Sequence, residues 1–397
     1  MPHMLRNPLV LPVYVPTFLM SFASGLLIPS LPLYAKSFGI SYSMIGLLLA
    51  TEGIGRIVGD LPAAIMLNKL GRKNAMVLGV IAVALSSAAL FFAPTVWIAM
   101  IFRLITGMGE SIWNISRHAY LADVTSPNQR GRALSVFGGI NRIGSFAGPA
   151  VGGFIAALYT LRSPFLIFGV IAILVALIAA IVVERSNTLI PTPTKGHLRH
   201  IGDIFKAHAQ ILLTAGSGQL FAQTIRSGRQ VIIPLFGADM LGLGYEDVGL
   251  IVSISGFVDM ALFYPAGYIM DHFGRKYAII PCFSIQGIGM ALIPFADGFT
   301  GLLLAACLIG FGNGIGSGNM MTLGADLAPK NAVGEFLGLW RLIGDGGFLS
   351  GPLAVGYVAD IFGLSPAAYV IGGIGLLSAS IFAFFVPETL HKSAHKQ

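Results

Sequence analysis

Apolar residues run in long, nearly unbroken stretches along this 397-residue chain, and short polar segments separate them. About 20 apolar residues are enough for a helix to cross the hydrocarbon core of a bilayer. The pattern predicts twelve such helices, at residues 9–35, 43–66, 75–93, 96–121, 133–160, 164–183, 208–237, 246–270, 277–295, 299–323, 335–360 and 366–386. The runs are continuous and do not alternate over ten-residue units, which excludes a membrane β-barrel as an interpretation. We therefore expect an all-α integral membrane protein.

The composition agrees with this interpretation. Hydrophobic residues make up 55% of the chain and charged residues only 10%, whereas soluble domains carry about 25% charged residues. The net charge of +7 invites a nucleic-acid-binding interpretation. We reject it because the basic residues lie in short loops on alternate sides of the predicted spans and form no single patch.

The distribution of basic residues predicts the orientation in the membrane. One side collects sixteen Lys and Arg residues, namely Arg6, Lys69, Arg72, Lys73, Arg117, Arg130, Arg132, Arg185, Lys195, Arg199, Lys206, Arg275, Lys276, Lys330, Lys392 and Lys396. The other side has only Lys36 and Arg162. Because basic loops stay on the cytoplasmic side, both termini are expected there. The first apolar run lacks a small-residue cleavage site and is interpreted as a retained helix.

The two halves of the sequence repeat at an offset of 203 residues. PAAIMLNKLGRKNAM (62–76) aligns with PAGYIMDHFGRKYAI (265–279), and 131–149 aligns with 334–352. A parallel repeat of this kind favours alternating access around a central site. We expect two pseudo-symmetric six-helix bundles, with domains at 1–187 and 208–397. They are joined by a cytoplasmic linker at 188–207, whose TPTKGHLRH run is typical of a flexible tether.

These features resemble the major facilitator superfamily over the whole chain. The loop after the second span in that family reads G-x-x-x-D-[RK]-x-G-[RK]-[RK], and GYIMDHFGRK matches it at Gly267, Asp271, Gly274, Arg275 and Lys276. The first-half copy keeps Lys69, Gly71, Arg72 and Lys73. It has Asn68 in place of the acidic residue, so the gating carboxylate is either missing there or moved to Asp60.

Two further motifs carry the resemblance. RLITGMGES is similar to the family's R-x-x-x-G-x-G motif at Arg103, Gly107 and Gly109. GSFAGPAVGG looks like the Gly-Pro motif of the drug–proton antiporter branch, through Gly144, Gly148, Pro149 and Gly152. The resemblance implies the major facilitator fold and a gating role for these motifs. The alternative for the glycines is ordinary close packing between helices.

Three charges follow one another at four-residue spacing inside an apolar segment: Glu52, Arg56 and Asp60. Residues four apart share a helix face, and a charge facing lipid near the bilayer centre costs about 3 kcal/mol or more. We therefore expect a ladder of charges that faces protein or water. In one interpretation, this ladder packs against a neighbouring helix, such as the one that contains Arg341 and Asp345, and Arg56 is part of the gate. In the other, the ladder carries protons.

The helix at 96–121 has a second line of charges, because Arg103, Glu110 and Arg117 are seven residues apart and lie on nearly one face. Burial and a neighbouring guanidinium act in opposite directions on the protonation of a carboxyl. Glu110 can therefore titrate as a cavity alternates between wet and dry. It is the first candidate for proton coupling or for contact with a charged cargo, and a static Glu110–Arg103 pair is the alternative.

The helix at 208–237 has a polar stripe formed by Gln219, Gln223, Arg226 and Gln230, at spacings of 4, 3 and 4. A stripe with an arginine and amides favours a cargo with an anionic or hydrogen-bond-accepting group. Alternatively, Arg226 only pairs with Glu110 or with another acid, such as Asp259.

The remaining candidates complete the predicted site. Further proton-coupling candidates are Asp259, Asp60, Asp345 and Glu52, and further cargo-binding candidates are Trp113, Asn114 and Asn313. Asp259 falls on Arg56 at the 203-residue offset, which suggests pairing between the halves. Aromatic and methionine side chains around Phe18, Met20, Phe22, Trp113 and Phe221 are expected to hold apolar parts of a cargo.

The sequence has no G-x-x-x-x-G-K-[ST] motif and no evident nucleophile–base pair, so we expect neither an enzyme nor a bound cofactor. His197 and His200 are interpreted as structural, which leaves no metal site.

We expect a monomeric, multi-pass cell-membrane transporter that exchanges protons for small amphipathic molecules or drugs, with a small-molecule substrate, protons and the lipid bilayer as its partners. The alternatives are an organic-anion, sugar or metabolite transporter, including a symporter, and an uncoupled lipid-handling or sensing protein of the same fold.

Overall fold

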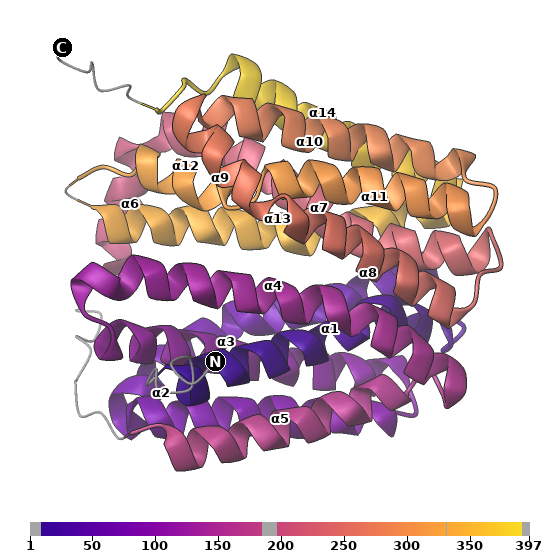
Figure 1. The fold of residues 1–397 in the computed structure, drawn as a ribbon, viewed down its shortest axis with the longest axis horizontal. Coiled ribbons are helices and arrows are strands. Elements are labelled where there is room, and N and C mark those ends of the chain that lie inside the picture. Colours follow the sequence, from indigo (N-terminus) through magenta and orange to yellow (C-terminus); the bar gives the residue numbers. More distant parts are fainter. Residues whose placement is uncertain (1–8, 185–196, 331, 391–397) are drawn as a thin grey trace. The chain divides into compact units, whose positions relative to one another are not determined.

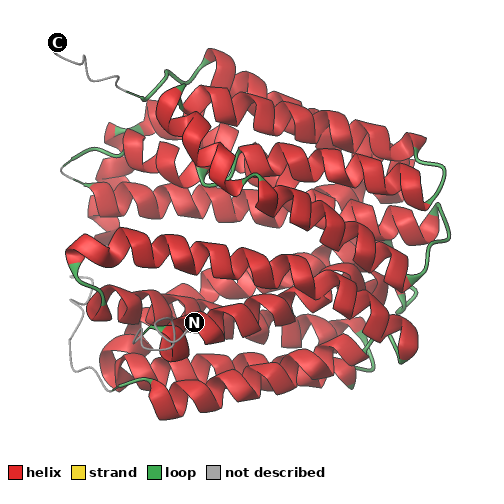
Figure 2. Cartoon of the chain, viewed as in Figure 1, coloured by secondary structure: helices red, strands yellow, loops and turns green. Residues whose placement is uncertain are grey.

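The computed structural model describes residues 9–184, 197–330 and 332–390. Every regular element in these ranges is a helix (Figures 1 and 2). The chain forms two compact units, of which one comprises Met1–Pro193 and Gly237–Ser253 and the other Thr194–Phe236 and Ile254–Gln397. The predicted domain boundaries at 187 and 208 stay a prediction.

The elements before the predicted linker belong to the first unit. They are η1 (Val10–Tyr14), α1 (Val15–Lys36), α2 (Tyr42–Phe91), α3 (Val96–Val124), α4 (Pro127–Leu158) and α5 (Ser163–Val182). Side-chain caps begin two of them, because the Ser41 hydroxyl accepts the N–H of Met44 at the start of α2 and Thr95 accepts that of Ile98 at the start of α3. Such caps satisfy backbone donors that a helix start leaves unpaired.

The elements after the predicted linker begin with a short helix. They are α6 (His197–Ala207), α7 (Ala209–Asp239), α8 (Tyr245–Ala261), α9 (Phe263–His272), α10 (Arg275–Leu292), η2 (Ile293–Phe295), α11 (Phe299–Ile315), α12 (Asn319–Leu327), α13 (Val333–Phe362) and α14 (Leu364–Phe384). α6 corrects the expectation of a flexible tether for the part of the linker from residue 197 on. Residues 185–196 and the side chains of His197 and His200 lie outside the described residues.

Each of the twelve predicted spans overlaps one or two of these helices, and the predicted fold class is confirmed. Eight stretches are long and apolar enough to cross a membrane: Val10–Lys36, Ile65–Phe91, Val96–Val124, Ser163–Val182, Tyr245–His272, Arg275–Phe295, Phe299–Leu327 and Leu364–Phe384. The other four predicted spans coincide with the start of α2 and with α4, α7 and α13. These helices carry several of the charged and glycine positions singled out above.

Glycines with positive φ lie at several breaks between helical segments. α2 covers two predicted spans, and the break between them is Gly71, whose φ of 74° is non-helical. Gly274, one repeat later, has a φ of 128° between α9 and α10. Glycine adopts positive φ without the steric penalty that a side chain imposes. α11 and α12 are likewise separated at Gly318, with a φ of 78°.

Close packing in the first unit fixes where the charged side chains lie. A Cβ on Gly107 of α3 would meet the carbonyl oxygen of Glu52 in α2 at 2.0 Å, and a Cβ on Gly55 would meet that of Leu104 at 2.2 Å. Such backbone approach is possible only where the side chain is absent. The two helices therefore bring Glu52 and its neighbours in α2 against the charged face of α3.

Candidate functional site

Four charged side chains of α2 and α3 form a chain of ion pairs in the first unit. Arg56 donates from Nε to the Glu110 carboxylate at 2.9 Å, and its terminal nitrogen also pairs with Glu52. Arg103 pairs with the second oxygen of Glu52. The order is therefore Arg103–Glu52–Arg56–Glu110, which we call the charge chain. Its two acids and two bases balance.

The charge chain differs from the two arrangements that the sequence suggested, which are a Glu110–Arg103 pair and a Glu52–Arg56–Asp60 ladder. Arg103 contacts Glu52, so the alternative of a static Glu110–Arg103 pair is wrong, and Arg56 contacts Glu110 in its place. Asp60 is not a rung of the ladder in α2, because its carboxylate accepts the hydroxyl of Ser111. The Glu52–Arg56 contact within α2 is confirmed. Spacing along one helix identified that contact, whereas the partner on the second helix needed the packing.

Burial makes the charge chain sensitive to protonation. Glu110 is 7% exposed and Arg103 is 5% exposed, while the side chain of Arg56 is 40% exposed. Ionised groups taken out of water need a partner of opposite charge. Protonation of Glu110 would remove one of the two negative charges that hold Arg56, so the contact between α2 and α3 at this point depends on the proton.

Arg117 is buried in α3 at 6% exposure, which corrects its assignment to a cytoplasmic loop. Its terminal nitrogens donate to the Thr17 hydroxyl at 3.2 Å and to the Asn114 side-chain oxygen at 2.7 Å. The guanidinium lies over the rings of Trp113 and Phe137, at 5.1 and 4.6 Å from their centroids. The seven-residue spacing from Glu110 was the sequence signal that could have placed it inside.

A second polar cluster lies in the other unit. Asn313 of α11 donates from its amide nitrogen to the Asp259 carboxylate in α8 at 2.6 Å, and its amide oxygen accepts Arg226 Nε of α7 at 2.9 Å. Arg229 lies 3.6 Å from the same carboxylate. Arg226 is therefore connected to Asp259 through Asn313, in place of the direct pair that was the alternative. Arg229, which lies between Arg226 and Gln230 of the predicted stripe in sequence, is the ion-pair partner.

The two clusters occupy equivalent positions of the repeat with different chemistry. At the offset of 203, Asp259 stands for Arg56 and Asn313 for Glu110. The first unit thus joins a guanidinium to a carboxylate, and the second joins a carboxylate to an amide. An amide does not titrate, which leaves Glu110 as the titratable member on the equivalent helix face.

The predicted stripe on α7 is only partly accessible. Gln219 is buried, and its amide oxygen has no hydrogen-bond partner among the described residues. Gln223, Arg226 and Gln230 are half-buried. Arg226 also lies over the ring of Phe283, with 5.2 Å to the centroid. The stripe therefore combines a guanidinium, amides and an aromatic face.

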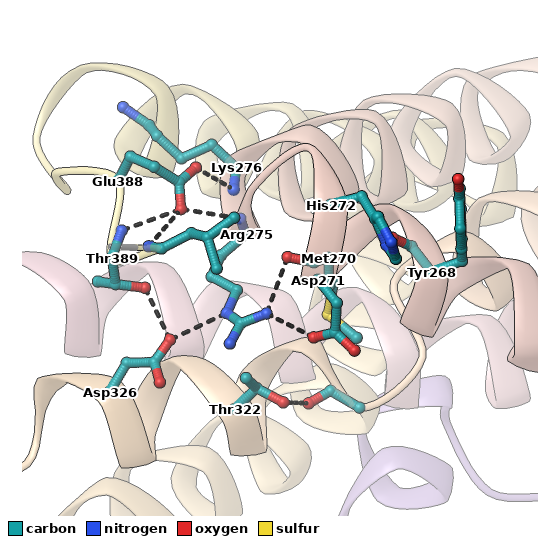
Figure 3. Close-up of polar contacts among 12 residues, drawn as sticks. Tyr268, Met270, Asp271, His272, Arg275, Lys276, Thr322, Asp326, Glu388 and Thr389 are labelled. Atoms are coloured by element: carbon teal, nitrogen blue, oxygen red, sulfur yellow. Dashed lines mark hydrogen bonds and ion pairs between the residues drawn. The ribbon is translucent and has the colours of Figure 1, made fainter. Parts of the chain in front are cut away.

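The motif loop of the second half forms a compact polar cluster around Arg275 (Figure 3). Arg275 donates to Asp326 at 3.0 Å, to Asp271 at 2.9 Å and to the carbonyl of Met270 at 2.8 Å. The predicted Asp271–Arg275 contact is confirmed. Asp326, from α12, is an additional partner that the motif pattern does not indicate.

Glu388 fastens the segment after α14 to this loop, and the sequence analysis missed it (Figure 3). Its carboxylate accepts the backbone N–H groups of Arg275 and Lys276 at 2.8 and 3.0 Å, and Thr389 donates its hydroxyl to Asp326. Partial burial by itself raises the pKa of Glu388, but the backbone N–H donors outweigh it and the pKa lies below its ordinary value. No periodicity marks this residue, because it follows the last helix.

The first-half motif has an equivalent ion pair. Arg72 pairs with Asp123 of α3, and these positions correspond to Arg275 and Asp326. Asp123 thus gives the first-half arginine an acid although Asn68 stands at the acidic position of the motif, and a gating role of Asp60 stays a prediction. Lys69 is exposed and Lys73 is half-buried.

The glycine motif of α4 lies against α1. Added Cβ atoms on Gly144, Gly148 and Gly152 would meet backbone atoms of α1 at 2.8, 2.5 and 2.2 Å. The expected close backbone approach is confirmed, and Pro149 lies inside α4. In contrast, a Cβ on Gly267 would meet nothing within 4 Å.

The other predicted residues lie apart from these clusters. Asp345 pairs with Arg341 one turn away in α13 at 3.6 Å, and both side chains are exposed. A cavity of about 640 Å³ lies beside the ends of α1 and α7, where Lys36 pairs with Asp239, and no predicted site residue lines it.

Comparison with known proteins defines the class. The family profile of the Major Facilitator Superfamily matches residues 13–225 and 215–397. The chain is 25% identical to multidrug resistance protein 2 of Bacillus subtilis over 294 residues, covering 72% of each protein. It is 23% identical to the quinolone resistance protein NorA of Staphylococcus aureus, covering 92% of this chain and 94% of that one.

A solved structure shows the same fold. The D-xylose–proton symporter superposes with a TM-score of 0.74 at 18% identity, covering 96% of this chain and 98% of the other. The chain belongs to the major facilitator superfamily and, within it, is most like the drug–proton antiporter branch.

Proposed function

We propose that this protein is a proton-coupled antiporter that exports small amphipathic compounds by alternating access. The observation that carries the proposal is the charge chain, in which Arg56 links the buried carboxylate of Glu110 to Glu52. The multidrug and quinolone resistance proteins among its relatives favour an amphipathic cargo. The proposed setting is a cell membrane, with a monomer whose termini are both cytoplasmic.

The charge chain supplies a physical basis for coupling. Ionised Glu110 and Arg56 attract each other across the α2–α3 contact, and protonation of Glu110 removes that attraction. Arg56 then keeps its ion pair with Glu52. A proton thus shifts the relative stability of two arrangements of these helices, which is the requirement for exchange between conformations.

The polar cluster of the second unit supports a role in cargo binding. Arg226 presents a guanidinium beside Asn313 and over Phe283. Such a group binds acceptors and anions, while the aromatic face accommodates an apolar body. Gln223 and Gln230 extend the same helix face. Asp259, Asp60 and Asp345 remain secondary candidates for proton transfer.

A second candidate function is symport of a sugar, organic anion or other metabolite. The fold shared with a D-xylose–proton symporter is compatible with it, and the Arg226 stripe favours an anionic cargo. An uncoupled lipid-handling protein is a third possibility. The three differ in whether, and in which direction, a proton gradient drives flux.

Reconstitution into proteoliposomes tests the proposal. With an imposed pH gradient, we expect the wild-type protein to move a fluorescent amphipathic dye against the flow of protons. E110Q is expected to reduce gradient-driven transport at least tenfold, because the amide does not titrate. E184Q is the matched control, since Glu184 is exposed after α5, and should transport like the wild type.

Three outcomes contradict the proposal. Dye flux in the same direction as protons indicates symport, and flux that ignores the gradient indicates an uncoupled protein. Full coupling in E110Q removes Glu110 from the mechanism.

A further inference from the structure

The guanidinium of Arg117 is buried without a carboxylate partner. Arg56 and Arg103 of the same unit each pair with an acid, whereas Arg117 forms no ion pair within the described residues. Glu110 influences it only through its electric field, two turns away on α3. A charge removed from water needs an opposite charge nearby to offset the lost hydration. Arg117 therefore has no counter-charge in contact with it in the described part of the chain.

Neutral groups hold Arg117 in place without using all its donors. One terminal nitrogen donates to Thr17 and the other to Asn114, while Nε has no acceptor among the described residues. A guanidinium has five N–H donors. Its orientation is thus fixed, and part of its hydrogen-bonding capacity remains unused.

The neighbouring polar groups also have donors to spare. One turn further along α1 and α4, the hydroxyl of Ser21 donates to the amide oxygen of Asn141. The amide oxygens of Asn114 and Asn141 therefore each accept one hydrogen bond. Their NH₂ groups have no acceptor in the described part of the chain, and Asn141 is exposed. The unused N–H donors of Arg117 and of these two amides match an acceptor with negative charge.

Aromatic rings surround the same place. Trp113 and Phe137 lie against the guanidinium. A ligand that satisfies both features has an anionic head and an apolar, ring-containing body.

We propose that Arg117, Asn114 and Asn141 bind the carboxylate of an amphipathic organic acid. The planar guanidinium can form two parallel hydrogen bonds with a carboxylate, and the two amides can donate further ones. The proposal rests on the proposed function in one respect, since it identifies a class of cargo for that transporter. It goes beyond it by assigning an anion site to the first unit, separate from Arg226.

Calorimetric titration of the full-length protein in detergent tests this site. The probes are 4-phenylbutyrate and its neutral amide, 4-phenylbutanamide. We expect wild-type protein to bind the acid at least tenfold more tightly than the amide. R117Q should bind the two with equal affinity, because the amide side chain has no charge to offer.

A second variant keeps Arg117 and supplies a carboxylate from the protein itself, in place of the carboxylate of a ligand. N114D places a carboxylate beside Arg117 at nearly the original shape, so it should raise the unfolding temperature and abolish the preference for the acid. R341Q is the matched control, since Arg341 is an exposed arginine of α13, and should keep the preference.

The outcomes separate clearly. Equal or undetectable binding of both probes by wild-type protein overturns the proposal, as does a preserved preference for the acid in R117Q or in N114D. A preference lost in R226Q but kept in R117Q assigns the anion site to the second unit instead. The assay uses no pH gradient, so its result is independent of the gradient-driven dye flux that tests the proposed function.

Discussion

Arg103 and Arg117 are buried to a similar degree on α3, yet only Arg103 has a carboxylate in contact with its guanidinium. Arg103 is neutralised by Glu52. Arg117 is held by neutral oxygens and aromatic rings, which stabilise a cation less than a carboxylate does. At the scale of single residues, burial therefore does not reveal a role. The presence or absence of a counter-charge separates the paired arginine from the one that we propose binds cargo.

Glu388 gives a pH-dependent prediction at the same scale. Its pKa is lowered in the folded protein, so its contribution to stability is fully present above the unfolded value of about 4.3 and disappears as the pH falls through the lower folded value. E388Q should therefore unfold at a lower temperature than the wild type near neutral pH. The difference should shrink as the pH falls below about 4.3 and vanish once the pH lies below the folded pKa of Glu388. Thermal unfolding in detergent across this range measures it, and a difference that persists unchanged in acid would contradict the assignment.

Helix pairs are held at their spacing by glycines, and this determines which charges meet. The Cβ positions of Gly107 and Gly55 point at backbone carbonyls of the facing helix. The ion pair between Arg56 and Glu110 depends on that spacing, because both side chains begin at the same α2–α3 interface. At the scale of elements, the small residues of the motif are part of the charged site.

A glycine substitution tests this dependence. G107A should destabilise the protein by about 1–3 kcal/mol, as overpacking does, because a methyl group 2.0 Å from the Glu52 carbonyl forces α2 and α3 apart. G139A in α4 is the matched control, since an added Cβ there meets nothing within 4 Å, and it should be neutral or slightly stabilising. Denaturation in detergent compares them. Equal stability of the two variants would show that the interface tolerates the methyl group.

The whole chain repeats a scaffold while changing its chemistry. A Cβ on Gly310 would meet the carbonyl of Ser255 at 2.3 Å, just as one on Gly107 would meet that of Glu52. Both pairs differ by the same 203 positions. Backbone contacts are thus shared by the two repeats, but Glu52 has been replaced by a hydroxyl. At the scale of the molecule, the two repeats therefore share their backbone packing and differ in the polar side chains that this packing brings together.

Labelling of single cysteines tests the predicted orientation. In a C282S/C307S background, S37C and S126C each place a thiol at an exposed position after α1 and before α4. If both termini are cytoplasmic, a membrane-impermeant maleimide added to intact cells should label S37C and should reach S126C only after permeabilisation. The reverse pattern would overturn the orientation, and equal labelling of both would contradict the assigned spans.

The sequence by itself determined the helical membrane class, the placement of the spans, the repeat and the family motifs. Each of these follows from the hydropathy and charge of a continuous stretch, or from residue spacing within one helix. None of them requires knowledge of which other helix packs against that stretch. The Glu52–Arg56 and Asp271–Arg275 contacts were predictable for the same reason.

Only the tertiary structure decided which charges meet between helices. Glu110 contacts Arg56 across 54 residues, Arg72 contacts Asp123, and Glu388 reaches the loop of Arg275 across 113 residues. Such pairings depend on the distance and rotation of two packed helices, and several sequence partners are equally compatible with the spacing. The same geometry places Arg117 inside, against Thr17 of α1 and Asn114 of its own helix.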